Sequence, residues 1–399
     1  MPTNQDIVKK TAALGAMNYL PLPVALTRGM GVWVWDVEGR KYMDMLSAYS
    51  ALSHGHCHPK IIAALKAQAD AITLTSRAFH NDQLCELYQR IVKLTGLPKV
   101  LPMNTGAEAV ETAIKAARKW GYDVKGVEAD RAEIIACTNN FHGRTVSILA
   151  MSTNEDYRRG FGPFGPGFRV VEYGSIESLE QIINDNTVAF LVEPIQGEAG
   201  IMVPPQGYLA EAARLCRERR VLLMADEIQT GFGRTGKMFC CEHEGVTPDV
   251  MIMGKALGGG VLPVSAIAGT EEVMGVFTPG IHGSTFGGNP LAAAVGVAAL
   301  DVLVQERLVE QAWHKGQYLM SRLRQIASPH IEEIRGKGLL VGIDLKPSSG
   351  HARPFCERLM DEGILAKETH DSVIRLAPPL VITQEELDWA IERVERVLA

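Results

Sequence analysis

Short apolar runs alternate with amphipathic stretches along most of this chain, from about Leu101 onward. Apolar runs that end at turn-forming or charged residues are typical of strands buried on both faces of a sheet, and the stretches between them can supply crossover helices. Strands of this kind are predicted at residues 134–137, 188–193, 221–226, 250–255 and 265–268. The pattern predicts an α/β fold, whose large domain has a mostly parallel central sheet flanked by helices.

The two ends of the chain show other patterns. Alternating residues at 32–35 and 41–43 surround a turn at Gly39 and predict a β-hairpin. Helices are predicted at 59–72, 82–94 and 289–305, and at the C-terminus after a capping box from Thr383 to Glu386. Three parts follow from these elements: residues 1–60, which contain the hairpin and belong to the small domain, a large domain at 61–300, and a C-terminal small α+β domain at 301–399.

The composition excludes several classes of protein. A net charge of −6 over 399 residues gives no basic footprint for nucleic acid. No apolar stretch approaches the roughly 20 residues of a membrane span, and the polar first ten residues lack the apolar segment of a secretory signal. The seven cysteines are odd in number and have no framework spacing, which indicates reduced thiols. We expect a cytoplasmic protein that binds neither nucleic acid nor a membrane.

The predicted strands at 221–226 and 250–255 end in the ionisable residues Asp226 and Lys255, and three glycines follow closely after Lys255. Open α/β sheets bind ligands at the carboxyl ends of their strands. Burial there would make a lysine a nucleophile toward an aldehyde. A lysine for a Schiff base and an aspartate for a pyridinium N–H together suit pyridoxal 5'-phosphate. Taken singly, the lysine could instead extend to solvent and the aspartate could cap a turn.

Other polar residues would complete such a site. Thr105, Gly106 and Ala107 open a helical pattern that runs to Trp120, and the N–H groups at a helix N-terminus bind phosphate. Ordinary N-capping is the commoner role of such a sequence. Gln229 follows Asp226 by three residues, so its amide either contacts the phenolic oxygen of the cofactor or lies at the surface.

A loop at 282–285 offers further hydroxyl groups. Its Ser284 and Thr285 could reach a phosphate or could simply form a turn.

Two other patterns suggest different chemistry. Residues 231–237 have the glycine spacing of nucleotide-binding loops, but Met238 stands where a phosphate loop needs Ser or Thr. We predict a loop there, followed by a strand at 238–241, and a nucleotide-binding enzyme that uses this loop is the alternative of a different class. His54, His56 and His58 alternate, but a structural turn is favoured over a metal site. No metal is predicted.

Specific motifs occur along nearly the whole chain, from about Asn18 to Pro379. They are NYLPLP at 18–23, SAYS at 47–50, PMNTG at 102–106, FHGRT at 141–145, EPIQGE at 193–198, DEIQTG at 226–231 and RLAPP at 375–379. With these motifs the chain resembles the ornithine aminotransferases. They belong, with the acetylornithine and 4-aminobutyrate aminotransferases, to the class-III, fold-type I enzymes that depend on pyridoxal phosphate.

The resemblance implies roles around the cofactor. Lys255 would bind the cofactor covalently and move the proton of the substrate, Asp226 would pair with the ring nitrogen, and Gln229 would contact the phenolic oxygen. Phe141 would stack on the ring. His142 stands where some relatives have tryptophan, which changes the expected stacking.

The phosphate group has its own implied partners. Thr105, Gly106 and Ala107 would hold it, and Ser284 and Thr285 would approach it from the neighbouring subunit. The resemblance therefore implies a homodimer with shared active sites, or a higher oligomer.

The substrate prediction depends on five implied positions. Arginine binds carboxylates through paired hydrogen bonds, and Arg144 and Arg375 would hold the two carboxylates of glutamate or 2-oxoglutarate. L-Ornithine has one carboxylate, so Glu198 would mask Arg375 and leave Arg144 free. Tyr19 would contact the α-amine, and Tyr49 would shape the pocket.

The predicted reaction transfers the δ-amino group of L-ornithine to 2-oxoglutarate in two ping-pong half-reactions. Its products would be glutamate and glutamate 5-semialdehyde, which cyclises to pyrroline-5-carboxylate. Acetylornithine or 4-aminobutyrate is the alternative amino donor within the same fold.

Overall fold

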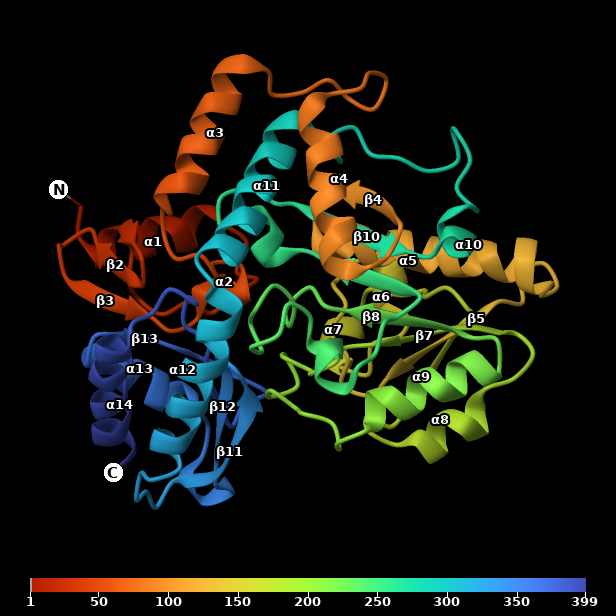
Figure 1. Ribbon diagram of the computed structural model, residues 1–399. Helices are drawn as coiled ribbons and strands as arrows, with labels where there is room; N and C mark the ends of the chain where they lie inside the picture. The colour runs from red at the N-terminus through yellow and green to blue at the C-terminus, as the bar shows by residue number, and fades with distance from the viewer. Residues whose placement is uncertain (1) are drawn as a thin grey trace.

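A seven-stranded sheet forms the centre of the larger part of the molecule in the computed structural model, which describes residues 2–399 (Figure 1). Its order is β4-β10-β9-β8-β7-β5-β6. The strands are β4 (Lys99–Met103), β5 (Glu133–Cys137), β6 (Phe168–Val171), β7 (Thr187–Val192), β8 (Leu222–Asp226), β9 (Val250–Met253) and β10 (Ser265–Gly269). Strands β5 to β9 pair in parallel, and only β10 runs antiparallel to its neighbours β4 and β9. The five predicted strands and the mostly parallel sheet are confirmed.

Helices cover both faces of this sheet because alternate residues of a buried strand point to opposite sides. In β7, Ala189 and Leu191 pack in one cluster with α5 (Gly106–Trp120), whereas Phe190 and Val192 pack in another with α9 (Tyr208–Glu218). The short helix α8 (Ile176–Ile182) joins α9 on the second face. Both faces of the central sheet are therefore buried against helices, as the continuous apolar runs predict.

Two smaller sheets involve the ends of the chain. The first has the order β1-β2-β3-β13, and the second has the order β11-β12-β15-β14. The first contains β1 (Leu26–Met30), β2 (Trp33–Asp36), β3 (Lys41–Asp44) and β13 (Ile364–Leu365); the second contains β11 (Ile331–Lys337), β12 (Leu340–Leu345), β14 (Lys367–Thr369) and β15 (Val373–Leu376). The predicted hairpin is β2–β3, and its strand β3 pairs in parallel with β13. The N-terminal strands consequently lie beside the C-terminal helices (Figure 1). The division at residues 60 and 300 stays a prediction.

The predicted helices form with the expected caps. They are α3 (Pro59–Ala71), α4 (Asp82–Thr95), α11 (Pro290–Gln305) and α14 (Gln384–Leu398). Asn289 caps α11, and Thr383 forms the predicted capping box with Glu386. The remaining helical segments are α1 (Asn4–Leu14), α2 (Ser47–Ser50), η1 (Gly121–Lys125), α6 (Val146–Leu149), α7 (Glu155–Arg158), η2 (Cys240–Glu244), η3 (Lys255–Gly258), α10 (Glu271–Met274), α12 (Leu308–Leu323), η4 (Pro347–Ser349) and α13 (Arg353–Asp361).

The strand predicted at 238–241 is wrong. Residues Cys240–Glu244 form a 3-10 turn, because the N–H group of Cys241 donates to the buried carboxylate of Glu227 at 2.8 Å instead of to a neighbouring strand. None of the helices formed by residues 2–399 combines the length and the apolar character needed to cross a membrane.

Candidate active site

The carboxyl ends of β5, β7, β8 and β9 meet at one edge of the large sheet, and a cavity of about 160 Å³ lies there. Open α/β sheets bind their ligands at this edge. The cavity is lined by Gly106, Ala107, Phe141, His142, Gly143, Glu193, Ile195, Glu198, Asp226, Ile228, Gln229, Thr230 and Lys255. The fold thus brings together seven of the predicted site residues, Lys255, Asp226, Gln229, Phe141, Gly106, Ala107 and Glu198, from five separate segments.

Lys255 lies two residues beyond the end of β9, at the start of the 3-10 turn η3. Its φ angle is 43°, in a region where non-glycine residues are uncommon. Burial lowers the pKa of the Lys255 amine, although the nearby carboxylates of Glu198 and Asp226 act in the opposite direction. A lowered pKa increases the neutral fraction of the amine, and the neutral amine is the nucleophile.

Asp226 is the last residue of β8, and its carboxylate has two partners in the chain. One oxygen accepts the N–H of Ile228 at 3.1 Å, and the other lies 2.7 Å from Nδ1 of His142. Burial disfavours the charged form of His142, but the hydrogen bond and the charge of Asp226 outweigh it and raise the pKa of the imidazole. The sequence analysis missed this pair, since it considered His142 only as a ring beside the cofactor.

Glu193 is a further buried carboxyl group in the cavity, and the sequence analysis gave it no role. One of its oxygens accepts the N–H of Phe141 at 2.8 Å. Burial raises the pKa of Glu193 to about 8, against the attraction of His142. Its sequence position could have identified it, because Glu193 directly follows the apolar strand β7 just as Asp226 ends β8.

The N-terminus of α5 faces the same cavity. Thr105 is the N-cap, and its side chain and the carboxylate of Glu108 form a capping box. The N–H groups of Gly106 and Ala107 belong to the first turn and have no acceptor within the described residues. They are therefore free to bind an anion, as a helix N-terminus does.

Ser284 and Thr285 occupy different surroundings. The hydroxyl of Ser284 accepts a hydrogen bond of 2.8 Å from the Asn104 amide of its own chain, next to the N-cap of α5. Thr285 is exposed. Neither residue lines the cavity.

Arg375 and Glu198 form a buried ion pair beside the cavity. Nη1 of Arg375 donates to Oε1 of Glu198 at 2.5 Å, and the arginine is 1% exposed. The same carboxylate oxygen accepts Nε2 of Gln229 at 3.1 Å. Burial would raise the pKa of Glu198, but Arg375 and Lys255 outweigh it and lower the pKa. The ring of Tyr49 lies 4.9 Å from the Arg375 guanidinium, so this arginine is covered on two sides.

Arg144 lies apart from this pair and is exposed. Its guanidinium lies 4.4 Å from the ring of Tyr157 and 5.7 Å from the ring of Phe141. The structure therefore holds one masked arginine next to Glu198 and one accessible arginine near Phe141, and both of these neighbours line the cavity.

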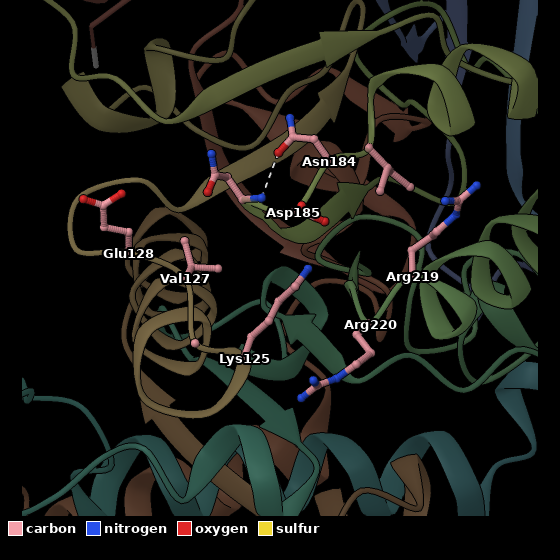
Figure 2. A pocket seen from close by; sticks show the side chains of 10 residues that line it. Lys125, Val127, Glu128, Asn184, Asp185, Arg219 and Arg220 are labelled. Carbon is pink, nitrogen blue, oxygen red and sulfur yellow. Dashed lines mark hydrogen bonds between the residues drawn. The ribbon is translucent and has the colours of Figure 1, made fainter.

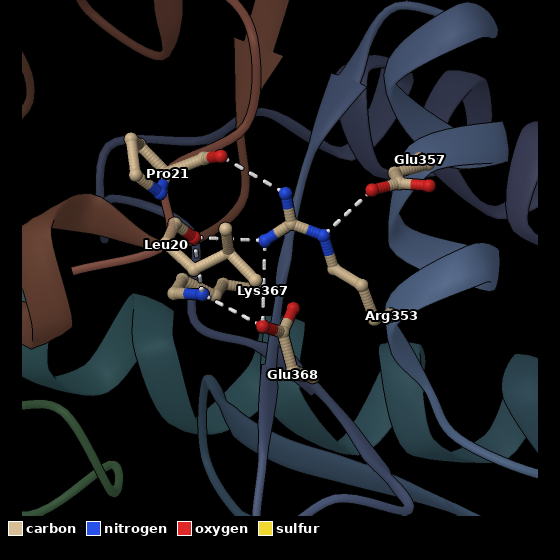
Figure 3. Close-up of polar contacts among 6 residues, drawn as sticks. All are labelled: Leu20, Pro21, Arg353, Glu357, Lys367 and Glu368. Atoms are coloured by element: carbon tan, nitrogen blue, oxygen red, sulfur yellow. Dashed lines mark hydrogen bonds and ion pairs between the residues drawn. The ribbon is translucent and has the colours of Figure 1, made fainter. Parts of the chain in front are cut away.

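Tyr19 is 62% exposed and lines a mostly apolar pocket of about 580 Å³ together with Tyr49. The backbone that carries Tyr19 is fixed from the C-terminal part of the chain (Figure 3). Arg353 donates to the carbonyl oxygens of Leu20 and Pro21, each at 2.9 Å, and Lys367 reaches Leu20 at 3.4 Å. Tyr19 therefore borders the same pocket as Tyr49, but its side chain forms no hydrogen bond with the residues that the structure describes.

The glycine-rich loop at 231–237 does not form a phosphate site. Residues 231–236 are buried, and the N–H groups of Gly231, Gly233 and Gly236 donate to carbonyl oxygens of the chain. Added Cβ atoms at Gly233 and Gly236 would contact Leu380 and Trp313, so these glycines permit close packing. The nucleotide-binding alternative has no structural support.

The three alternating histidines bind separate partners. His54 contacts the carbonyl oxygen of Ala299, His56 contacts Asp44, and His58 contacts Glu306. Within residues 2–399, no group of three or more His, Cys, Asp or Glu side chains could hold a metal ion.

Another pocket, of about 440 Å³, lies at the opposite edge of the large sheet, near the amino end of β7 (Figure 2). The Lys125 and Arg220 side chains extend in different directions there, and Arg219 pairs with Glu180 at 3.3 Å. Lys125 is held by the carbonyl oxygen of Thr187. The cations do not converge on one point, so this pocket offers no defined anion site.

The cavity at the carboxyl edge fits pyridoxal phosphate. It offers an amine with a lowered pKa, a buried carboxylate for a ring nitrogen, and unpaired N–H groups for a phosphate. Among the described residues, Oε1 of Gln229 and Nε2 of His142 are buried without a hydrogen-bond partner. Buried polar atoms rarely stay unpaired, and these two border the cavity where the cofactor ring would lie.

Comparison with known sequences places the chain among aminotransferases. The family description "Aminotransferase class-III" matches residues 14–398. The chain is 62% identical to the ornithine aminotransferase of Geobacillus sp. (strain WCH70), with all of both chains covered. It is 59% identical to the ornithine aminotransferase of Bacillus subtilis (strain 168), over 99% of this chain and 98% of that protein.

Solved structures agree with this assignment. The ornithine aminotransferase of Toxoplasma gondii ME49 superimposes with a TM-score of 0.98 at 45% identity, over 100% of this chain and 95% of that chain. The acetylornithine aminotransferase of Elizabethkingia anophelis superimposes with a TM-score of 0.91 at 48% identity, over 100% and 99% of the two chains. The scaffold is therefore shared by enzymes with different amino donors, and the choice of donor has to be argued from the site.

Proposed function

Because the chain belongs to the class-III aminotransferases, we propose that it is a pyridoxal phosphate-dependent enzyme that transfers the δ-amino group of L-ornithine to 2-oxoglutarate. The products are L-glutamate and L-glutamate 5-semialdehyde, which cyclises to pyrroline-5-carboxylate. The two substrates react in separate half-reactions at one site, so the kinetics are ping-pong.

The observation that carries the choice of substrate is the buried pair of Arg375 and Glu198, together with an exposed Arg144 that lies apart from it. Ornithine has one carboxylate, and with Arg375 masked this group binds at Arg144. The δ-amine then extends toward Lys255. Glutamate and 2-oxoglutarate have two carboxylates, so binding of either one requires Glu198 to release Arg375.

The chain supplies the binding and proton-transfer groups of each half-reaction. When bound, pyridoxal phosphate supplies an aldehyde that takes up the amino group and a ring that stabilises negative charge on the neighbouring carbon. Asp226 keeps the ring nitrogen protonated, and the hydrogen bond from His142 fixes the carboxylate of Asp226 in position. The Nζ atom of Lys255 takes the proton from Cδ of ornithine, and its lowered pKa leaves a larger fraction of the amine neutral and able to accept that proton.

The phosphate of the cofactor binds at the N-terminus of α5. Thr105, Gly106 and Ala107 supply the hydroxyl and the free N–H groups, and the helix dipole favours the negative charge. We place the ring of Phe141 against the cofactor and the amide of Gln229 near its phenolic oxygen, since both residues line the cavity.

The enzyme acts as a homodimer in this proposal, and the partner contributes Ser284 and Thr285 to the phosphate. In and next to the loop that carries them, Thr285 and the apolar side chains of Ile281 and Phe286 are exposed. Exposed apolar side chains next to polar ones are common at subunit interfaces.

The test compares amino donors. Purified enzyme is given L-ornithine, N-acetylornithine or 4-aminobutyrate, each with 2-oxoglutarate, and kcat/KM is measured. We expect ornithine to exceed both other donors by at least about tenfold, because its charged α-amine and single carboxylate match Tyr19 and Arg144. A higher kcat/KM for N-acetylornithine would assign the enzyme to the alternative reaction.

A further inference from the structure

Residues Ser47 to Ser50 form one turn of left-handed helix. Their φ angles are 52°, 47°, 60° and 73°, and none of the four is glycine. A left-handed turn is unfavourable for side chains other than glycine, because the Cβ atom approaches the following carbonyl oxygen too closely. Such a conformation persists only where the surroundings hold it, and it occurs most often at functional sites.

This turn carries Tyr49 to the ion pair of Arg375 and Glu198. Tyr49 has φ 60° and ψ 42°, and its half-buried ring lies 4.9 Å from the guanidinium of Arg375. The Cβ direction of a residue depends on its backbone angles, so a right-handed turn would turn this ring away from Arg375. The left-handed conformation is therefore what covers the arginine.

The carboxylate of Asp44 holds the start of this turn. Its Oδ1 accepts the N–H groups of Leu46 at 2.9 Å and Ser47 at 2.8 Å, and its Oδ2 lies 2.8 Å from Nε2 of His56. Asp44 is 8% exposed, so these hydrogen bonds are shielded from water. Asp44 and His56 also line the apolar pocket that contains Tyr19 and Tyr49.

We infer that Asp44, held by His56, is a positioning residue for substrate selection: it fixes the left-handed turn that seats Tyr49 over Arg375. This inference rests on the proposed ornithine reaction. With Tyr49 in place, Arg375 is covered by a ring and paired with Glu198, so the ornithine carboxylate binds at Arg144. Without Asp44 the turn relaxes, Tyr49 leaves the guanidinium, and Arg375 competes for the carboxylate.

Asp36 provides a matched control. It is a buried carboxylate in the same sheet, 3% exposed. Its Oδ1 accepts two backbone N–H groups, from Glu38 at 3.0 Å and Arg40 at 2.8 Å, and its Oδ2 accepts Tyr42 at 3.0 Å. Its hydrogen bonds to backbone N–H groups are thus of the same kind as those of Asp44, but they hold the β2–β3 turn and not the turn at Ser47–Ser50.

The experiment measures single half-reactions of the purified holoenzyme with L-ornithine and with L-glutamate. For Asp44→Ala we expect the ratio of ornithine to glutamate rates to fall by about tenfold, the effect of losing charge-assisted hydrogen bonds. Asp44→Asn keeps one acceptor for the two N–H groups and should show a smaller fall. Asp36→Ala should lower the melting temperature without changing the ratio.

A second variant separates positioning from folding. Glycine adopts positive φ at little cost, so adding Ala48→Gly to Asp44→Ala should recover part of the ratio. An unchanged ratio in Asp44→Ala and Asp44→Asn, with melting temperatures lowered as in Asp36→Ala, would overturn the inference. If Asp44→Ala does not fold, Asp44→Asn alone decides in the same way. Failure of the wild-type enzyme to react with ornithine would instead refute the proposed function.

Discussion

Single side chains at the carboxyl edge of the large sheet provide the proposed chemistry. Asp226 is the clearest case, because it ends a buried strand and, among residues 2–399, has only His142 and a backbone N–H as partners. A carboxylate in this position can stabilise a positive charge on a ring nitrogen, whereas an amide of the same size cannot.

Asp226→Asn should therefore lower the rate of the ornithine half-reaction by a hundredfold or more, about 2.7 kcal/mol of barrier or above, while the protein still folds. Stopped-flow absorbance of the holoenzyme measures this rate. Asp249→Asn is the control, since Asp249 is a carboxylate near the opposite edge of the sheet that accepts the N–H of Leu223 at 2.8 Å. If the ornithine half-reaction is equally fast in both variants, Asp226 does not stabilise the charge on the ring nitrogen.

The buried carboxyl group of Glu193 makes the stability of the protein depend on pH. Its pKa is raised by burial from 4.5 to about 8, so between these values the folded protein keeps a proton that the unfolded chain releases. Stability from this group is complete below the unfolded pKa and is lost as the pH rises through the folded pKa.

The apoprotein should accordingly lose thermal stability as the pH rises from 4.5 to about 8, and the pH series should extend to both sides of this range. Glu193→Gln should flatten this loss, whereas substitution of the exposed Glu155 to Gln should not. The melting temperature of each protein is measured across the pH series. If it depends on pH in the same way in the wild type, in Glu193→Gln and in the Glu155 variant, the pKa of Glu193 is not raised.

At the scale of elements, the N-terminal segment with Tyr19 and the left-handed turn with Tyr49 form two walls of one pocket. The first wall depends on Arg353, the first residue of α13, which donates to the carbonyl oxygens of Leu20 and Pro21 (Figure 3).

Arg353→Leu should release this segment and raise KM for ornithine by about three- to tenfold, with a smaller change in kcat. Glu357→Gln is the matched control, because it alters a partner of Arg353 and keeps both carbonyl contacts. Steady-state kinetics distinguish the variants. If KM for ornithine is the same in both, Arg353 has no part in placing Tyr19.

Some of these elements could be predicted from the sequence, and others could not. Strands β8 and β9 and the residues after them were predictable, because buried parallel strands are continuous apolar runs whose ends are easy to locate. The turn at Ser47–Ser50 was not predictable, because its sequence contains no glycine or asparagine and because Arg375, which its Tyr49 contacts, lies near the other end of the chain. The loop at 231–237 suggested a nucleotide site because packing glycines and phosphate-binding glycines have the same spacing.

At the scale of the whole molecule, Arg234 connects three distant parts of the chain. Its guanidinium is fully buried and donates to the carbonyl oxygens of Leu339 at 3.0 Å and Pro378 at 2.6 Å, and to the hydroxyl of Ser53 at 3.3 Å. These contacts join the large sheet region to the strand segment that carries Arg375 and to the residues after the left-handed turn.

Arg234→Met should lower the free energy of unfolding by about 2–4 kcal/mol, because it leaves three buried acceptors unpaired. Denaturant titration measures the loss. Arg214→Met is the control, since Arg214 forms ion pairs on the exposed side of α9, which contribute little. Equal stability of both variants would show that the Arg234 contacts are dispensable.

In the proposed reaction, the masked Arg375 directs the δ-amine of ornithine, and not its α-amine, to Lys255. Isotope transfer distinguishes the two amines. Ornithine labelled with ¹⁵N at either the α- or the δ-position is incubated with enzyme and 2-oxoglutarate, and the glutamate formed is analysed by mass spectrometry. With the wild-type enzyme we expect label in glutamate from δ-labelled ornithine only. With Glu198→Ala, in which Arg375 is unmasked, we expect some α-label as well. Transfer of the α-label by the wild-type enzyme would refute this role of Arg375.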